Sequence, residues 1–463
     1  MTTAAGRLAS FTSELTLERI PREVLDAAKL HLLDTLGCGL AAHALDTAPY
    51  AREAIREQGG DGPATVIGLE GGAGAQDAAF VNGTTCHALD FDDTHAASVS
   101  HISVVVVPAA LAVAETFGAN GAALLSALVA GNEVTIRVGM AAGEAFHARG
   151  FHPTAVCGVF GATAAAARLR GLDVDTTAQA LGIAGSLASG ILEFLADGSS
   201  TKRLHPGFAS RAGVLAAALA AHGASGPATV LEGRFGLYRA FLGRDDIDIE
   251  AQVASLGTTW ETLRIAFKPY PACHYVHAAL DATIEAMTDA GLTADDIEEV
   301  VVISPPAGVS MVLEPADSKA RPRSEYEAKF SLPFSVASYL QHGKVDVTSY
   351  TDSAIADEEV LALAAKVRYE VKDFETAGLA FPGGARVRAT DGRVIERELL
   401  YQRGDPQNPM SDAEVLAKYC TNAGLALDAA AVTTLEDAAF DLEHQPDVSA
   451  LRALAHAAPR VAA

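Results

Sequence analysis

Helical patterns built from small apolar residues fill the first 266 residues of the chain, and they constrain the fold more than any other feature. Apolar residues recur at helical spacing after Pro21, which is a good first-turn residue. A break at 119–121 separates two further helices, and another helix is expected at 153–170. Glycine is abundant and aromatic residues make up only 6%. Small side chains in such numbers favour closely packed helices over sheets.

Three local features refine this expectation. Thr176 and Gln179 have the spacing of a capping box at a helix start. Glu133 and Arg137 stand four residues apart, in the favourable order for a helix-surface ion pair. The most apolar run, 102–114, is shorter than the roughly 20 residues of a membrane span, so it predicts a buried core helix.

Strand patterns appear only after Phe267. Apolar and polar residues alternate in several short runs, and Asp391-Gly392 predicts a two-residue hairpin turn between two of them. Helices are expected at 274–290 and 334–341, and Ser411 to Glu414 has the spacing of a capping box. The expected strands are 297–304, 367–371, 385–389 and 394–396.

The order of these patterns predicts a mainly α protein with two domains. We expect a large all-helical domain built from both chain ends, residues 1–266 and 403–463. A smaller α+β domain, residues 267–402, is inserted between them. Because an inserted domain is joined by two stretches of chain, it suits a lid over a cleft.

The formal net charge of -24 limits the partners. A surface this acidic argues against nucleic acid and anionic membranes as binding partners. An anion-binding site in this chain therefore needs its own local cations. The five cysteines form no CxxC pair, and residues 1–13 lack a signal-peptide pattern, so we expect reduced thiols and a cytoplasmic protein.

The segment from His87 to Ser103 concentrates three carboxylates and three imidazoles before the most apolar helix. Aspartates near a helix start complement the helix dipole, so the cluster has a purely structural interpretation. Aspartate and histidine also serve as catalytic groups or metal ligands, but no second motif with metal-ligand spacing exists. The residues alone leave all three interpretations open.

Three further segments carry polar groups in apolar surroundings. His152 stands at a helix start, where it either contacts an anion or only caps the helix. Lys202, with Arg203 and His205, is expected in a polar loop that is either solvated or part of a site. Lys268 precedes Cys273 and His277 at the domain boundary, and nothing marks Cys273 as a nucleophile. We hypothesise that Lys202, Lys268, His101, His152 and His277 converge in one cationic pocket for a small di- or tricarboxylate.

Several motifs resemble the MmgE/PrpD family, which includes 2-methylcitrate dehydratase, cis-aconitate decarboxylase and iminodisuccinate epimerase. The similarity runs in order over essentially the whole chain. The motifs that carry it are HALDFDDTH, HIS, GFHPTAVCG, TKRLHPGFASR, FKPYPACHYVHA, EAKFSLPFS and GDPQNPMSDAE.

The resemblance implies a large helical domain with a smaller α+β lid, a homodimer, and no metal or organic cofactor. It also implies which positions form the site. Asp90 and Thr94 would orient a histidine or a substrate hydroxyl, and the lysines would hold substrate carboxylates. We expect the catalytic residues to be His101, His152, Lys202 and Asp90, and the substrate-binding residues to be Thr94, Lys268, His277 and Cys273.

Two departures bear on the reaction. Decarboxylase-like members resemble DFDDTWHPATHPS, whereas this chain reads DFDDTHAASVSHIS, one residue longer and with His95 in place of tryptophan. Cys273 also stands where those members have a histidine. We therefore expect a hydro-lyase, such as a 2-methylcitrate dehydratase of propionate metabolism. Decarboxylation of cis-aconitate, epimerisation of an iminodisuccinate-type acid, and carboxylate binding without catalysis are the alternatives.

Overall fold

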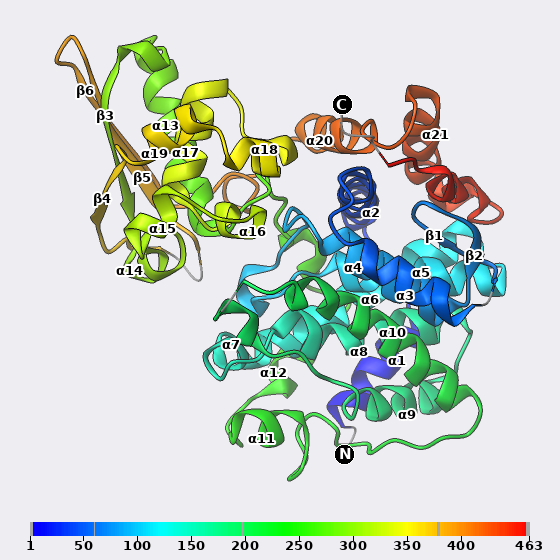
Figure 1. The fold of residues 1–463 in the computed structure, drawn as a ribbon. Helices are drawn as coiled ribbons and strands as arrows, with labels where there is room; N and C mark the ends of the chain where they lie inside the picture. Colours follow the sequence, from blue (N-terminus) through cyan, green and yellow to red (C-terminus); the bar gives the residue numbers. More distant parts are fainter. Residues whose placement is uncertain (1–2, 60, 197, 377–379, 460–463) are drawn as a thin grey trace. The chain divides into compact units, whose positions relative to one another are not determined.

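The computed structural model describes residues 3–59, 61–196, 198–376 and 380–459, which fold into two compact units (Figure 1). The helical unit comprises the residues up to Ala88, Asp92–Ala266, and those from Ser411 onward. The sheet unit comprises Leu89–Phe91 and Phe267–Met410. The chain is mainly α, as expected. The predicted domain limits and the role of the inserted part as a lid stay predictions.

The helical unit contains most of the helices. Its helices are α1 (Ala4–Glu14), α2 (Arg22–Ala44), α3 (Pro49–Gln58), α4 (Ala75–His87), α5 (Ser103–Phe117), α6 (Gly121–Ala142), α7 (Ala145–Ala148), α8 (Pro153–Leu169), α9 (Val174–Ala184), α10 (Thr201–Ala221), α11 (Leu237–Leu242), α12 (Ile249–Val253), α20 (Asp412–Ala423) and α21 (Ala429–Phe440). It also has two short antiparallel strands, β1 (Ala64–Val66) and β2 (Leu69–Ala73). The prediction of an all-helical part was wrong in this detail, because strands of three to five residues leave no clear period-two pattern.

Helix starts follow local side-chain chemistry. The side chain of Asn120 accepts from the Ala123 amide at 2.8 Å, which confirms the predicted break before α6. The predicted capping box of Ser411 and Glu414 is also confirmed at α20. The predicted box at Thr176 is wrong. The cap of α9 is Asp173, which accepts from the Thr176 amide at 2.8 Å, so the helix begins three residues earlier.

Small residues let the central helices approach closely. Helices α4, α5, α8 and α10 pack against one another in the helical unit (Figure 1). A Cβ added at Gly207 of α10 would stand 2.3 Å from the Thr84 hydroxyl and 2.4 Å from the Phe80 carbonyl of α4. The run predicted as a buried core helix is α5, from Ser103 to Glu115 entirely buried. One described helix, α6, is long and apolar enough to cross a membrane, but 89% of its apolar window is buried inside the protein, as in a core helix.

The predicted surface pair of Glu133 and Arg137 forms, but not at the surface. Its nitrogen and oxygen lie 3.2 Å apart, and both residues are buried. The Arg137 guanidinium also donates to the carbonyls of Gln252 and Thr259, and Glu133 accepts from the Thr262 amide at 2.8 Å. Spacing along a helix predicts the pairing, whereas the segment 252–262 that covers it comes from far along the chain.

The sheet unit is built on four strands in the order β4-β3-β5-β6. Strands β3 and β4 are parallel, and the other neighbours are antiparallel. Helix α13 packs against β5 and β6, and α17 and α19 pack against each other beside it (Figure 1). The described elements are β3 (Ile297–Ser304), β4 (Arg368–Val371), β5 (Gly383–Ala389), β6 (Val394–Leu399), α13 (His274–Ala290), α14 (Pro306–Gly308), α15 (Ala316–Ala320), α16 (Glu325–Lys329), α17 (Leu332–His342), α18 (Asp352–Ile355) and α19 (Glu358–Ala364). These confirm the predicted strands, the hairpin and both predicted helices.

Candidate active site

A buried aspartate between two histidines forms the centre of a polar cluster in the helical unit. Asp92 is fully buried in the loop between α4 and α5. Both of its carboxylate oxygens lie 3.0 Å from Nδ1 of His87, the last residue of α4. Its Oδ2 also lies 2.7 Å from Nδ1 of His101, just before α5. One carboxylate thus holds two imidazoles, whose ring centroids are 4.6 Å apart.

The charge of Asp92 determines how both rings are protonated. Burial alone raises the pKa of this carboxyl, but the adjacent His101 and His87 outweigh it and hold the pKa well below its usual range. The carboxylate is therefore ionised and can only accept hydrogen bonds. The Nδ1 atom of each ring must therefore donate to it, so each ring exchanges protons through Nε2. An aspartate that fixes this tautomer makes histidine a general base.

The neighbouring Asp93 anchors the loop. It accepts from the Ser103 amide at 3.1 Å and from the Ser103 hydroxyl, at the first turn of α5. Nδ1 of His31, on α2, lies 2.8 Å from Oδ2 of Asp93, the oxygen that also accepts from the Ser103 hydroxyl. The structural interpretation of the Asp-rich segment thus holds for Asp93, which satisfies free N–H groups at a helix start. Between these anchors Val99 has a φ of 53°, a left-handed conformation that a β-branched residue seldom adopts.

His152 and Lys202 lie at the same cluster. His152 immediately precedes α8, and its ring centroid is 6.0 Å from that of His87 and 6.4 Å from that of His101. Burial, followed by the neighbouring histidines and the Lys202 ammonium, holds the pKa of His152 well below its usual value. Burial and the same lysine also contribute to His87, where the pKa falls to about 4. The imidazoles of His87 and His152 are therefore neutral at pH 7, and Lys202 supplies a positive charge beside them.

The polar loop predicted around Lys202 is wrong. Lys202 is a buried residue in the first turn of α10, and His205 follows one turn later. The loop was predicted because Ser199, Ser200 and Pro206 are residues that favour loops. In the structure Pro206 lies inside α10. A helix fixes the lysine more firmly than a loop.

The remaining predicted site residues have contacts of their own within each unit. Thr94, in the helical unit, pairs its backbone with Ala266, through bonds of 2.9 and 2.7 Å. In the sheet unit, Lys268 donates to the Asp90 carbonyl at 2.8 Å and to its carboxylate at 3.1 Å. Asp90 itself has a φ of 54°.

Cys273 and His277 also belong to the sheet unit. Cys273 caps α13 and is buried, with its amide bonded to the Lys329 carbonyl at 2.9 Å. His277 lies one turn into α13, with Nε2 at 3.1 Å from the Ala272 carbonyl. The structure thus brings His101, His152 and Lys202 together. That Lys268, Cys273 and His277 join them in one pocket stays a prediction.

Sequence reasoning did not select His87, Asp92 or His205 as site residues. The signals were present, since Asp92 lies two residues from Asp90 and His205 lies three from Lys202 on one helix face. The three ligand atoms of His87, Asp92 and His101 lie within 4.8 Å of one another, a spacing that could hold a metal ion. A metal on Asp92 would compete with the two imidazoles for its oxygens, so the geometry described fits a hydrogen-bonded base better.

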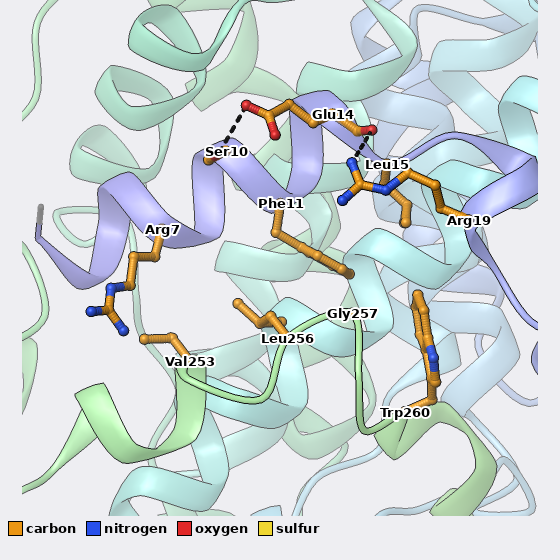
Figure 2. A pocket seen from close by; sticks show the side chains of 10 residues that line it. All are labelled: Arg7, Ser10, Phe11, Glu14, Leu15, Arg19, Val253, Leu256, Gly257 and Trp260. Atoms are coloured by element: carbon orange, nitrogen blue, oxygen red, sulfur yellow. Dashed lines mark hydrogen bonds between the residues drawn. The ribbon is translucent and has the colours of Figure 1, made fainter.

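Elsewhere in the helical unit, a pocket of about 310 Å³ lies between α1 and the segment 253–260 (Figure 2). Its walls include the rings of Phe11 and Trp260, 6.1 Å apart. Its polar groups bond one another: Ser10 donates to the Glu14 carboxylate, and Arg19 donates to the Glu14 carbonyl. None of the described residues that line it is a predicted site residue.

Comparison with known proteins decides the family. The N-terminal domain of the MmgE/PrpD family matches residues 6–250, and its C-terminal domain matches residues 270–442. The chain belongs to the MmgE/PrpD family. This confirms the resemblance that the sequence motifs indicated.

The curated relatives include proteins named cis-aconitate decarboxylase. The chain is 30% identical to the human enzyme, with 95% of this chain and 92% of the relative covered. It is 28% identical to the enzyme of Aspergillus terreus, covering 96% and 94%. It is 29% identical to the cis-aconitate decarboxylase-like protein oryM of Aspergillus oryzae, covering 97% and 96%.

Proposed function

We propose that this member of the MmgE/PrpD family is a lyase that decarboxylates a small polycarboxylate of the cis-aconitate type. The names of its relatives support the reaction. The observation that carries the proposal is the 2.7 Å contact between Asp92 and Nδ1 of His101, which leaves Nε2 of His101 to exchange a proton with a substrate.

The chemistry requires a place for negative charge. When the bond between carbon and a carboxylate breaks, CO2 leaves and its bonding electrons form an enediolate-like anion beside a remaining carboxylate. The ammonium of Lys202 stabilises that anion, which matters in a protein with a net charge of -24. A histidine N–H then delivers a proton to carbon, and the assignment of that role to His101 or His152 is part of the test.

A hydro-lyase is the second candidate, and one observation favours it. His95, at the position where decarboxylase-like members have tryptophan, is buried and bonded to Ser98 at 3.1 Å and Glu261 at 3.3 Å. In this chain a polar, hydrogen-bonded histidine therefore takes the place of a large apolar tryptophan in the loop that follows Asp92. In this reaction the base removes a proton next to a carboxylate, and hydroxide leaves from the adjacent carbon.

Incubation in D2O with citrate, 2-methylcitrate, cis-aconitate and an iminodisuccinate-type acid, followed by proton NMR, separates the candidates. Decarboxylation gives a product with one carboxyl fewer and a new deuterium on carbon. Dehydration gives an alkene, and epimerisation exchanges the proton without changing the formula. Absence of product and of deuterium exchange with every acid would leave only a carboxylate-binding protein.

Lys202→Met tests the site, because it keeps the length of the side chain and removes its charge. We expect turnover to fall by at least about 10²-fold. Arg203→Gln is the matched control, since it also removes a cation from this helical turn. The Arg203 guanidinium donates to the Thr47 carbonyl at 3.0 Å. Equal turnover in Lys202→Met and the wild type would exclude Lys202 from the site.

We extend the proposal to the setting of the enzyme: a cytoplasmic homodimer that needs neither a metal nor an organic cofactor. The family resemblance supports the homodimer and the independence from cofactors, and the cysteines without a CxxC pair support the cytoplasm. Turnover that survives dialysis against EDTA, and a sedimentation mass of two chains, are the expected results.

A further inference from the structure

A second pair of histidines adjoins the Asp92 cluster in the helical unit. Nδ1 of His152 lies 3.0 Å from Nδ1 of His205, and the ring centroids are 5.2 Å apart. His152 stands at the start of α8, while His205 lies on α10 one turn beyond Lys202. Both residues are buried, so water does not separate the two nitrogens as it would at a surface.

A contact between two Nδ1 atoms restricts protonation. Two unprotonated nitrogens at 3.0 Å would repel each other through their lone pairs, and two N–H groups would place two hydrogens in one gap. One nitrogen must therefore donate and the other accept. If both rings are neutral, each carries one hydrogen, and only one of the two hydrogens lies between the Nδ1 atoms. The rings are then opposite tautomers, one with its hydrogen on Nδ1 and the other with its hydrogen on Nε2.

The surroundings keep both rings neutral. Burial, followed by His87 and Lys202, lowers the pKa of His205 to about 4, and the pKa of His152 is also well below its usual value. The charged and titratable groups that act on the pair are Lys202, His87 and His101. The ring of Phe194 packs against the histidine pair. It stands edge-on to both imidazoles, at centroid distances of 6.1 Å from His152 and 5.8 Å from His205.

The backbone next to the pair is shaped to let the rings meet. Gly190 has a φ of +109°, and its carbonyl accepts from the His152 amide at 3.0 Å. A Cβ at this position would stand 2.9 Å from the Ala155 side chain and 3.4 Å from Nδ1 of His205. Glycine is therefore required both for the conformation and for the space beside the His205 ring.

We propose that His205 is a positioning residue that shares one proton with Nδ1 of His152 and thereby sets whether Nε2 of His152 takes or gives a proton. This rests on the proposed function for its role in turnover. When Nε2 of His152 accepts a proton from substrate carbon, its Nδ1 proton moves to Nδ1 of His205, and the positive charge moves with it. The reverse transfer returns a proton from Nε2 of His152 to carbon.

The first test needs no substrate. Nitrogen-15 NMR of protein labelled at histidine reports which ring nitrogen carries hydrogen, and the spectra of His152→Asn and His205→Asn assign the two rings. At pH 7.5 we expect one ring of the pair protonated on Nδ1 and the other on Nε2. Two Nε2–H tautomers, or two imidazolium rings, would overturn the proposal.

Kinetics then test the role in turnover. The His205→Asn amide can still bond Nδ1 of His152, so we expect kcat within about tenfold of the wild type. His205→Leu cannot, and its kcat should fall by about 10²-fold with KM little changed. His222→Asn, at the exposed end of the same helix, is the matched control. Equal losses for the Asn and Leu variants would overturn the positioning role. If no acid is turned over, the proposed function fails while the tautomer measurement still decides the shared proton.

Discussion

Replacing Asp92 with asparagine removes one buried negative charge and changes the side-chain volume very little. The carboxylate accepts from both His87 and His101, whereas an amide offers one acceptor oxygen and one donor NH2 group. One of the two imidazoles must therefore lose its hydrogen bond or change its tautomer. His101, one of the two residues proposed to transfer the proton, has the shorter contact with Asp92, at 2.7 Å, so its loss should affect turnover more.

The magnitude follows from the bond that is lost. A hydrogen bond to a charged group contributes about 1.5–3 kcal/mol. If that energy acts on the transition state, kcat falls by about 10- to 150-fold. A wrong tautomer costs more, since the corresponding change in a serine-protease triad lowers kcat by about 10⁴. We expect Asp92→Asn to lie between these limits.

The assay is turnover by NMR at saturating substrate, together with thermal unfolding followed by circular dichroism. Asp93→Asn is the matched control, because Asp93 is equally buried in the same loop but bonds Ser103 and His31. It should lower the unfolding midpoint while lowering kcat less than Asp92→Asn does. A folded Asp92→Asn enzyme with the kcat of the wild type would refute the reasoning.

Three further predictions concern stability and titration. Lys418→Met should lower the free energy of unfolding at pH 8 by about 3–5 kcal/mol, because it leaves Asp34, 2.7 Å away and buried, without its cation. Burial raises the native pKa of Asp34, so keeping this carboxyl ionised lowers the stability as pH rises. The loss of unfolding free energy in Lys418→Met, measured by urea denaturation, should therefore be smaller at pH 5 than at pH 8, and an equal loss at both would contradict this. Gly207→Ala should lower the unfolding midpoint through overpacking of about 1–3 kcal/mol, and an unchanged midpoint would show that α4 and α10 can separate freely. Burial raises the pKa of Asp281 to about 6 although Tyr270 donates to it at 2.6 Å, so Tyr270→Phe should raise that midpoint further in a carbon-13 NMR titration; a lower midpoint would contradict the bond.

Much of the secondary structure follows from neighbouring residues. Helix 274–290 and strand 297–304 lie where their apolar periods predict, and the turn at 391–392 joins β5 to β6 as expected. The capping box at Ser411 forms for the same reason: both partners belong to one turn of chain. The box at Thr176 failed because Asp173, three residues earlier, caps the helix by accepting from the Thr176 amide, which places Thr176 inside the first turn.

Membership of the MmgE/PrpD family and the net acidity of the chain were evident from the sequence, which also indicated His101, His152 and Lys202 as candidate site residues. These properties reside in local motifs and in composition. The sequence could not show that Asp92, rather than Asp90, contacts two imidazoles, or that His205 faces His152. Such contacts depend on how α4, α5, α8 and α10 pack, and packing is decided by small residues far apart in the chain. Protonation states follow from that packing, because only burial together with specific neighbours shifts a pKa by several units.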